Sequence, residues 1–135
     1  MPRLSHLPRR AVASAGDDAI EFAESIGWSV EAGRGFYVLD EWQKYCIRGI
    51  LSEDENARLC AFLVLLIVPR QNGKGNSLAA RELAGVTLFG DQLITHTAHQ
   101  FDTAQEHFLR MSLLFETCPA LEGKLKRIRT ANGSE

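Results

Sequence analysis

The chain has 135 residues, of which 45% are hydrophobic and 24% are charged, a composition typical of one globular domain with a moderate core. Its formal net charge of −2 excludes a protein that binds polyanions through its overall charge, so any contact with nucleic acid must come from local basic patches. The longest unbroken apolar run, residues 61–68, is too short to span a bilayer, and three cysteines at unrelated spacings argue against a disulfide framework and a zinc site.

The first part of the chain is predicted to be a basic tail followed by one helix. Residues 1–16 contain prolines and arginines and show no periodicity. Apolar residues then recur with helical spacing behind Asp17 and Asp18, and Gly27 is a typical stop signal. We therefore expect a helix that ends near residue 26.

Residues 36–56 are predicted to contain a short extended run, a second helix and a polar connection. Residues 36–39 are apolar, and residues 40–45 begin a helix with acidic residues in its first turn, where they favour the helix dipole. Ser52 and Glu55 have the spacing that caps a short helical turn at the surface.

Two strands are predicted on either side of a third helix. Residues 60–68 are apolar at almost every position, which is typical of a strand covered on both faces in a parallel sheet, and Pro69 ends the run. A helix is expected over residues 73–89. Residues 93–97 contain β-branched side chains and predict a second strand.

A fourth helix is expected behind Thr103 and Glu106, which have the spacing of a capping box. Its apolar face should pack on a sheet, and Cys118–Pro119 should end it; this face comprises Phe101, Ala104, Phe108, Met111 and Phe115. Residues 125–130 predict a third strand. Alternating strands and helices predict βαβ units and therefore an α/β fold, with a mainly parallel sheet and crossover helices.

The junction between the first of these strands and its helix resembles a phosphate-binding loop. Gly73 and Gly75 allow close approach of the backbone to phosphate, the following helix start adds N–H groups and partial positive charge, and Lys74 can reach phosphate oxygens. The standard pattern has a glycine at position 68 and Ser or Thr at position 75, where this chain has Val68 and Gly75. A glycine-rich turn with an exposed lysine therefore stays open as the alternative.

Two further features favour nucleotide binding. Arg70 lies inside the loop, where a cation stabilises charge developing on a γ-phosphate. Trp42 and Gln43 lie upstream, and a glutamine amide carries both donors and an acceptor, as pairing with an adenine edge requires. For Trp42 alone, a core aromatic is the alternative interpretation.

These motifs together resemble the large terminase subunit of tailed bacteriophages, the motor that packages viral DNA. Residues 68–75 are similar to that family's deviant Walker A loop, Trp42–Gln43 to its adenine-contacting motif, and the segment from Thr97 to Phe108 to the next strand and helix. The resemblance covers roughly residues 36–133, and it implies an α/β fold of the P-loop NTPase type, a parallel sheet with crossover helices that is incomplete in this chain. It also implies a division into an N-terminal tail and helix, residues 1–35, and the N-terminal portion of a P-loop ATPase domain, residues 36–135.

The resemblance implies a role for each matching residue. Lys74 would bind the nucleotide phosphates and Arg70 would be the cis-acting arginine, both as catalytic residues. The remaining cofactor-binding residues would be Trp42, Gln43, Gln71, Asn72, Gly73 and Gly75. The implied cofactors are ATP and Mg²⁺. The implied partners in full-length relatives are double-stranded DNA, the portal and the small terminase subunit, with no membrane, and the implied location is the host cytoplasm.

The sequence also departs from this family. A Walker B segment, an apolar run followed by Asp-Glu, is needed for Mg²⁺ and water activation; residues 113–116 are the nearest match, but they fall on the fourth helix. The C-terminal nuclease domain is missing too. We therefore expect a truncated or split terminase that binds nucleotide without turnover. The alternatives are a fragment that acts only by assembly with a partner chain and another P-loop ATPase of the helicase-like kind.

A metal site is weighed at His96 and His99, which are three residues apart. No third ligand of the right kind is near them in sequence, and a strand end followed by a turn would not keep both on one face. We therefore expect no metal ligands in this chain.

Overall fold

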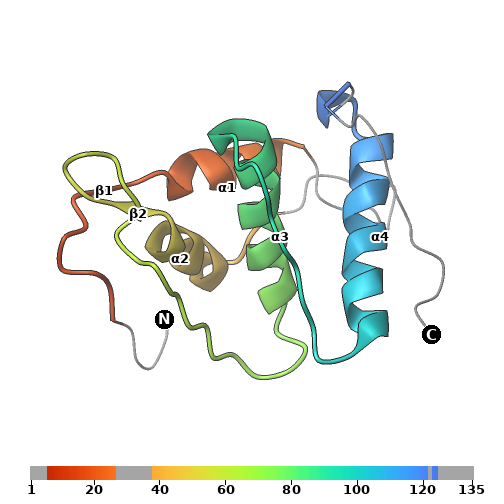
Figure 1. Cartoon of the computed structure of the whole chain (residues 1–135), viewed down its shortest axis with the longest axis horizontal. Coiled ribbons are helices and arrows are strands. Elements are labelled where there is room, and N and C mark those ends of the chain that lie inside the picture. Colours follow the sequence, from red (N-terminus) through yellow and green to blue (C-terminus); the bar gives the residue numbers. More distant parts are fainter. Residues whose placement is uncertain (1–5, 27–37, 122, 125–135) are drawn as a thin grey trace.

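The computed structural model describes residues 6–26, 38–121 and 123–124. Over these residues the chain is mixed α/β and mostly helical (Figure 1). Its elements are β1 (Ala13–Ser14), α1 (Gly16–Ser25), α2 (Glu41–Ile50), β2 (Ser52–Glu53), α3 (Lys74–Ala84), the π-helical turn η1 (Gly85–Phe89), α4 (Phe101–Thr117) and the 3-10 turn η2 (Pro119–Leu121). The predicted boundary at residue 35 and the predicted strand at 125–130 lie outside the described residues.

Helices α1, α2 and α3 share one hydrophobic core, and all three helices were predicted from the sequence. The core consists of apolar residues from these helices and from the two ends of α2: Ala19, Ile20, Ala23, Leu39, Ile47, Leu51, Ala80 and Ala84. The contact between α1 and α2 is close, because a Cβ built on Gly16 would lie 2.5 Å from Cα of Arg48. Asp17 in the first turn of α1 also pairs with Arg48 across this contact, at 2.8 Å.

Helix α4 packs through its C-terminal half on α3 and on the end of α1. Leu83, Leu114 and Leu121 are buried in this second cluster, and Met111 and Phe115 pack against it. The helix ends at Thr117 before Pro119, as predicted. The predicted capping box is wrong, because α4 begins at Phe101 and Thr103 lies inside its first turn. The predicted apolar face rests on helices, not on a sheet, and Phe101 at its N-terminal end is 68% exposed.

The one sheet among the described residues is small and antiparallel, with Ala13 opposite Glu53 and Ser14 opposite Ser52. The capped turn predicted at Ser52 and Glu55 is therefore wrong. Ser52 is buried in the strand β2, and its hydroxyl donates to the carbonyl of Gly49 at 2.9 Å, closing the end of α2.

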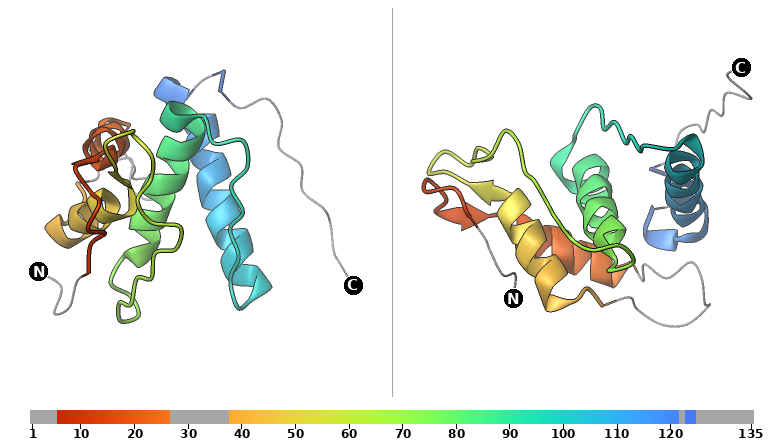
Figure 2. Two further views of the ribbon diagram at one scale, coloured as in Figure 1. Left: turned by 60° about the vertical axis from the view of Figure 1, so that its left-hand side comes forward. Right: turned by 90° about the horizontal axis from the view of Figure 1, so that it is seen from below.

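The predicted strands at residues 60–68 and 93–97 are extended but not paired in a sheet, and no parallel ladder occurs in the described part of the chain. The two segments lie on opposite sides of α3, one toward α2 and one toward α4 (Figures 1 and 2). The prediction that residues 60–68 are buried on both faces is wrong here, since Phe62, Leu63 and Ile67 are 107%, 82% and 84% exposed. In the described part of the chain, no neighbouring strand covers these faces.

Candidate functional site

The start of α3 is a glycine turn with an unusual backbone. Gly73 is the N-cap and has a left-handed conformation, with φ of 70°. Gln71, two residues earlier, also has a positive φ, 62°, which is uncommon for a residue with a side chain. Such conformations are costly unless the surroundings hold them, so the turn from Pro69 to Gly73 is a shape that neighbouring groups must support.

Gln43 supplies this support from α2. Its side chain is 1% exposed, and its amide nitrogen donates to the carbonyl of Gly73 at 2.9 Å. Its amide oxygen accepts from the backbone N–H of Asp40 at 2.8 Å, as part of the capping box that begins α2. A Cβ on Gly73 would lie only 2.9 Å from the same amide nitrogen, so the contact favours glycine at this position. One glutamine therefore fixes two helix starts relative to each other.

The electrostatics of the α3 start differ from those of α1 and α2. The other two helices carry acidic residues in their first turns, whereas α3 has none and begins with Lys74. The N–H groups of a first turn have no acceptor within the helix, and their positive end is unfavourable for a lysine. An anion bound at this helix start would accept hydrogen bonds from N–H groups and would balance the charge of Lys74. There is open space for it beside Gly75.

The predicted loop residues are contiguous and accessible. Arg70 through Gly75 are all exposed, so their side chains and backbone are available to a ligand. Trp42 is half-buried on α2, one residue before Gln43. The hydrogen bond from Gln43 to Gly73 thus brings the Trp42–Gln43 motif next to the loop at residues 70–75. The adenine contact of Gln43 stays a prediction. The amide oxygen of Gln43 and one of its N–H groups already bond within the protein, to Asp40 and Gly73.

The hydroxyl that usually contacts Mg²⁺ is replaced by Gly75, and Ser77 is the nearest substitute. Ser77 is 0% exposed, and its Oγ has no hydrogen-bond partner among the described residues. A hydroxyl with no accessible surface does not contact an ion at the loop. The residues described here therefore fit a phosphate group but do not supply a ligand set for Mg²⁺.

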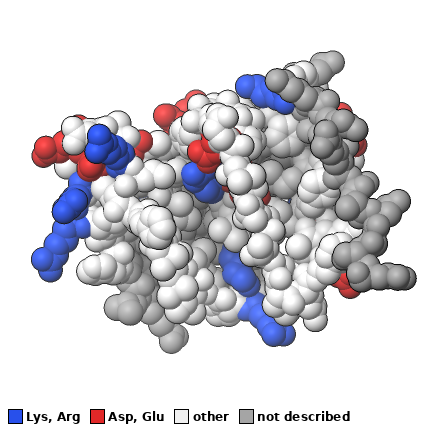
Figure 3. Space-filling model, in the orientation of Figure 1, with Lys and Arg blue, Asp and Glu red and all other residues white. Residues whose placement is uncertain are grey.

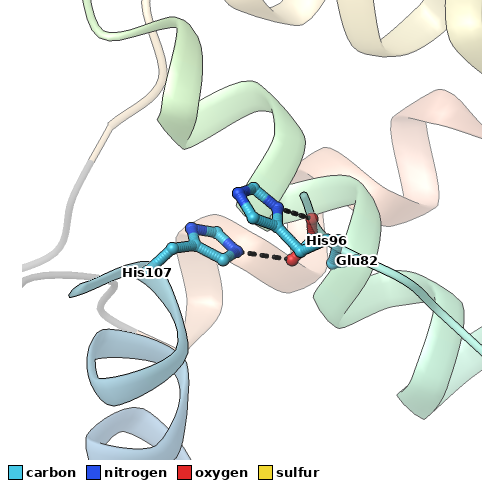
Figure 4. A group of neighbouring side chains, drawn as sticks. All are labelled: Glu82, His96 and His107. Carbon is cyan, nitrogen blue, oxygen red and sulfur yellow. Dashed lines mark hydrogen bonds and ion pairs between the residues drawn. The ribbon is translucent and has the colours of Figure 1, made fainter. Parts of the chain in front are cut away.

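A second group of chemically capable side chains lies further along α3. The Glu82 carboxylate forms hydrogen bonds with two histidines, His96 on the extended segment after η1 and His107 on α4 (Figure 4). The distances are 2.8 Å from His96 Nδ1 to Oε1 and 2.6 Å from His107 Nε2 to Oε2. The two imidazole rings are stacked, with centroids 3.8 Å apart. One carboxylate thus joins three segments of the chain.

The environment of Glu82 favours its ionised form. Burial alone would raise the pKa of the Glu82 carboxyl, but the hydrogen bonds from His107 and His96, with their charge, outweigh burial and hold this pKa below 4.5. The carboxylate is therefore available as a ligand at neutral pH.

This cluster was missed from the sequence. The predicted pair was His96 with His99, but His99 is exposed and is not part of the group. The actual group is joined by Glu82, which lies 14 residues before His96 and 25 residues before His107 in the sequence. Only the packing of α4 beside α3 brings them together, and no local spacing signals it.

No helix in the described part of the chain is both long and apolar enough to cross a membrane. Comparison of the chain with protein-family models, with curated proteins and with solved structures gave no match.

Proposed function

We propose that this chain is the ATP-binding, N-terminal part of the ATPase domain of a large terminase subunit. The observation that carries the proposal is the hydrogen bond from Gln43 to the carbonyl of Gly73. It joins the Trp42–Gln43 motif to the Arg70–Gly75 loop across 30 residues of sequence. The resemblance to terminases rests on these same two motifs, and in a nucleotide site they have to be neighbours.

The chemistry of the loop supports phosphate as its ligand. The first turn of α3 has no side-chain cap hydrogen bond and lies at the positive end of the helix dipole, and Lys74 adds a full charge at the first helical position. Arg70 is exposed three residues before Gly73 and would add a second cation. Triphosphate is the ligand that satisfies all of these groups together, with Lys74 on the β- and γ-phosphates and Arg70 on the developing charge.

Hydrolysis by this chain alone is not part of the proposal. The sequence has no Walker B acids at a strand end, and Gly75 and the buried Ser77 leave no hydroxyl for Mg²⁺ at the loop. In full-length relatives, Mg²⁺ supplies charge stabilisation at the γ-phosphate and hydrolysis is coupled to DNA translocation. We expect the 135-residue chain to bind ATP weakly and not to turn it over.

The partners belong to the proposal for the complete motor. On the face shown in Figure 3, Lys and Arg side chains lie at separate places and do not form one continuous basic stripe. We propose contacts with double-stranded DNA, the portal and the small subunit for the full-length relatives, which would act in the host cytoplasm.

The binding test uses a fluorescent ATP analogue and two single-lysine variants. Lys74→Ala should weaken binding about 10- to 100-fold, because a hydrogen bond to a charged group is worth about 1.5–3 kcal/mol. Lys124→Ala is the matched control, since it also removes one exposed lysine and should bind as the wild type does. Equal affinities of the two variants would refute the loop assignment. Steady phosphate release that Lys74→Ala abolishes would refute the claim of inactivity.

A second candidate is a non-catalytic chain that works by assembly. It is favoured by the apolar side chains exposed on both faces of residues 61–67, such as Phe62, Leu65 and Ile67. A partner chain with Walker B and nuclease segments would complete a parallel sheet on this segment, the arrangement predicted from the sequence. The coding DNA that follows tests it. An apolar run ending in Asp-Glu supports a split motor, and unrelated sequence contradicts it.

A further inference from the structure

The cluster of Glu82, His96 and His107 has the composition of a metal site. Two imidazole nitrogens and one carboxylate oxygen, one from each residue, all lie within 4.8 Å of one another. They come from α3, from the segment after η1 and from α4, so no single element creates the grouping (Figure 4). The side chains are mostly buried, with exposed fractions of 17%, 26% and 14% for Glu82, His96 and His107.

We propose that Glu82, His96 and His107 bind one divalent transition-metal ion of the zinc class. Imidazole nitrogen with one carboxylate is a ligand set that suits Zn²⁺ and its neighbours, whereas Mg²⁺ and Ca²⁺ prefer oxygen ligands only. The site is therefore distinct in chemistry from the Mg²⁺ that accompanies ATP. The inference does not rest on nucleotide binding at the α3 start.

The three side chains would rearrange locally to hold one ion. Ligand atoms around a four-coordinate zinc, each at about 2.0–2.2 Å from the ion, are roughly 3.3 Å apart. The two nitrogens are 2.8 and 2.6 Å from the carboxylate oxygens, as hydrogen-bond donors. These contacts go to different oxygens of the carboxylate, and the three ligand atoms lie within 4.8 Å of one another, so replacing the two shared protons by one ion requires the side chains to shift. The two rings are stacked with an interplanar angle of 12°, and a nitrogen lone pair lies in the plane of its ring, so the rings have to rotate to aim both nitrogens at one ion.

The surroundings leave room for a fourth ligand. Three protein ligands leave one position of a tetrahedral zinc for water or a small anion. A cavity of ≈ 470 Å³ borders Glu82 and His96. Its other walls are mostly apolar, among them Val86, Ile94 and Phe108, and Thr87 and Lys124 also line it. Apolar walls exclude solvent that would screen the charge of a bound ion, so the attraction between the ion and its ligands becomes stronger.

Metal binding would also fasten α4 to α3. The C-terminal half of α4 is held by the apolar cluster around Leu114, whereas His107 contacts α3 only through the Glu82 carboxylate among the interactions described. An ion shared by α3, α4 and the segment between them would hold all three, so the ion should raise the unfolding temperature of the chain.

The test measures Zn²⁺ binding by calorimetry on tag-free, reduced protein. His107→Gln and Glu82→Gln should each weaken Zn²⁺ binding at least about 10-fold, since even supporting residues of metal sites contribute 10–100-fold. His99→Gln is the matched control, because His99 is an exposed histidine three residues from His96. It should bind as the wild type does. The expected pattern would be overturned by unchanged affinity in His107→Gln, or by equal losses in all three variants.

A measurement on the wild-type protein keeps the proposal testable even if a variant fails to fold. The chain has four histidines, and the ring nitrogens of each are visible by NMR. On addition of Zn²⁺, signals of His96 and His107 should shift while those of His6 and His99 stay in place. Mg²⁺ at the same concentration should shift none. Zn²⁺-dependent shifts at His6 and His99 alone would mean surface binding and refute the site. Unchanged ATP affinity in His107→Gln would separate this result from the loop proposal.

Discussion

The buried amide of Gln43 gives the sharpest test of how the loop is held. In Gln43→Leu the buried polar amide is replaced by an apolar side chain of similar volume, and two hydrogen bonds are lost, one to Gly73 and one from Asp40. Each neutral hydrogen bond contributes about 1 kcal/mol, so the loss should be about 2 kcal/mol. Gly73 keeps its bond from the N–H of Asn76, at 3.0 Å, and Asp40 is exposed to water, so a larger penalty is not expected.

Gln92→Leu is the matched control for this change. Gln92 also donates from its amide nitrogen to a glycine carbonyl, that of Gly90 at 3.0 Å, but at an exposed site. The loss there should be under about 0.5 kcal/mol. Urea unfolding followed by circular dichroism measures both, and Gln43→Leu should also lower the melting temperature by roughly 8 °C. If the two variants lose equal stability, Gln43 does not support the loop in the way described.

Two further perturbations test the helical core. Gly16→Ala should lower the free energy of unfolding, measured in urea, by about 2–3 kcal/mol, because the new Cβ would meet the backbone of Arg48. Gly75→Ala is the control, since its Cβ would meet nothing within 4 Å and the stability should not fall. An unchanged stability in Gly16→Ala would contradict the close contact between α1 and α2. Glu24 tests pH dependence: burial alone raises its pKa, but the bonds from Lys44 and from the N–H of Leu39 outweigh burial and hold the pKa below 4.5. Since this folded-state pKa is lowered, the stabilisation is present above about pH 4.5 and is lost as pH falls through the folded value. Glu24→Gln should therefore cost about 1 kcal/mol at pH 7 and little in acid, and a pH-independent difference between the two urea midpoints would contradict this reasoning.

The helices could be predicted from the sequence because their signals are local. Apolar spacing behind Asp17 placed α1, and Pro119 marked the end of α4. The helix expected over residues 73–89 is present as α3 followed by η1. Periodicity and stop signals act within a few turns of the chain, so they do not depend on what else packs nearby. The exact start of α4 was missed, because Thr103 has capping chemistry at a position inside the helix.

The sheet and the histidine cluster could not be predicted in the same way. An apolar run such as residues 60–68 shows that a segment can form a strand, but pairing requires a neighbouring strand, and no residue within the run specifies one. The Glu82 cluster depends on how α4 lies beside α3, which is a long-range property. The nearness of Gln43 to the loop was expected only from the resemblance to terminases, and the structure gives it a physical form in the bond to Gly73.

The small side chains of the helical core have a consequence for how the chain unfolds. Of the 13 buried hydrophobic residues in the described part of the chain, five are alanines. An alanine loses no rotamer freedom on burial, which makes the close helix contacts inexpensive in entropy, but it also removes little apolar surface from water. Unfolding therefore exposes less new surface than in a typical domain of this length. The heat-capacity increment and the urea dependence of the unfolding free energy will both be small, and the thermal transition will be broad.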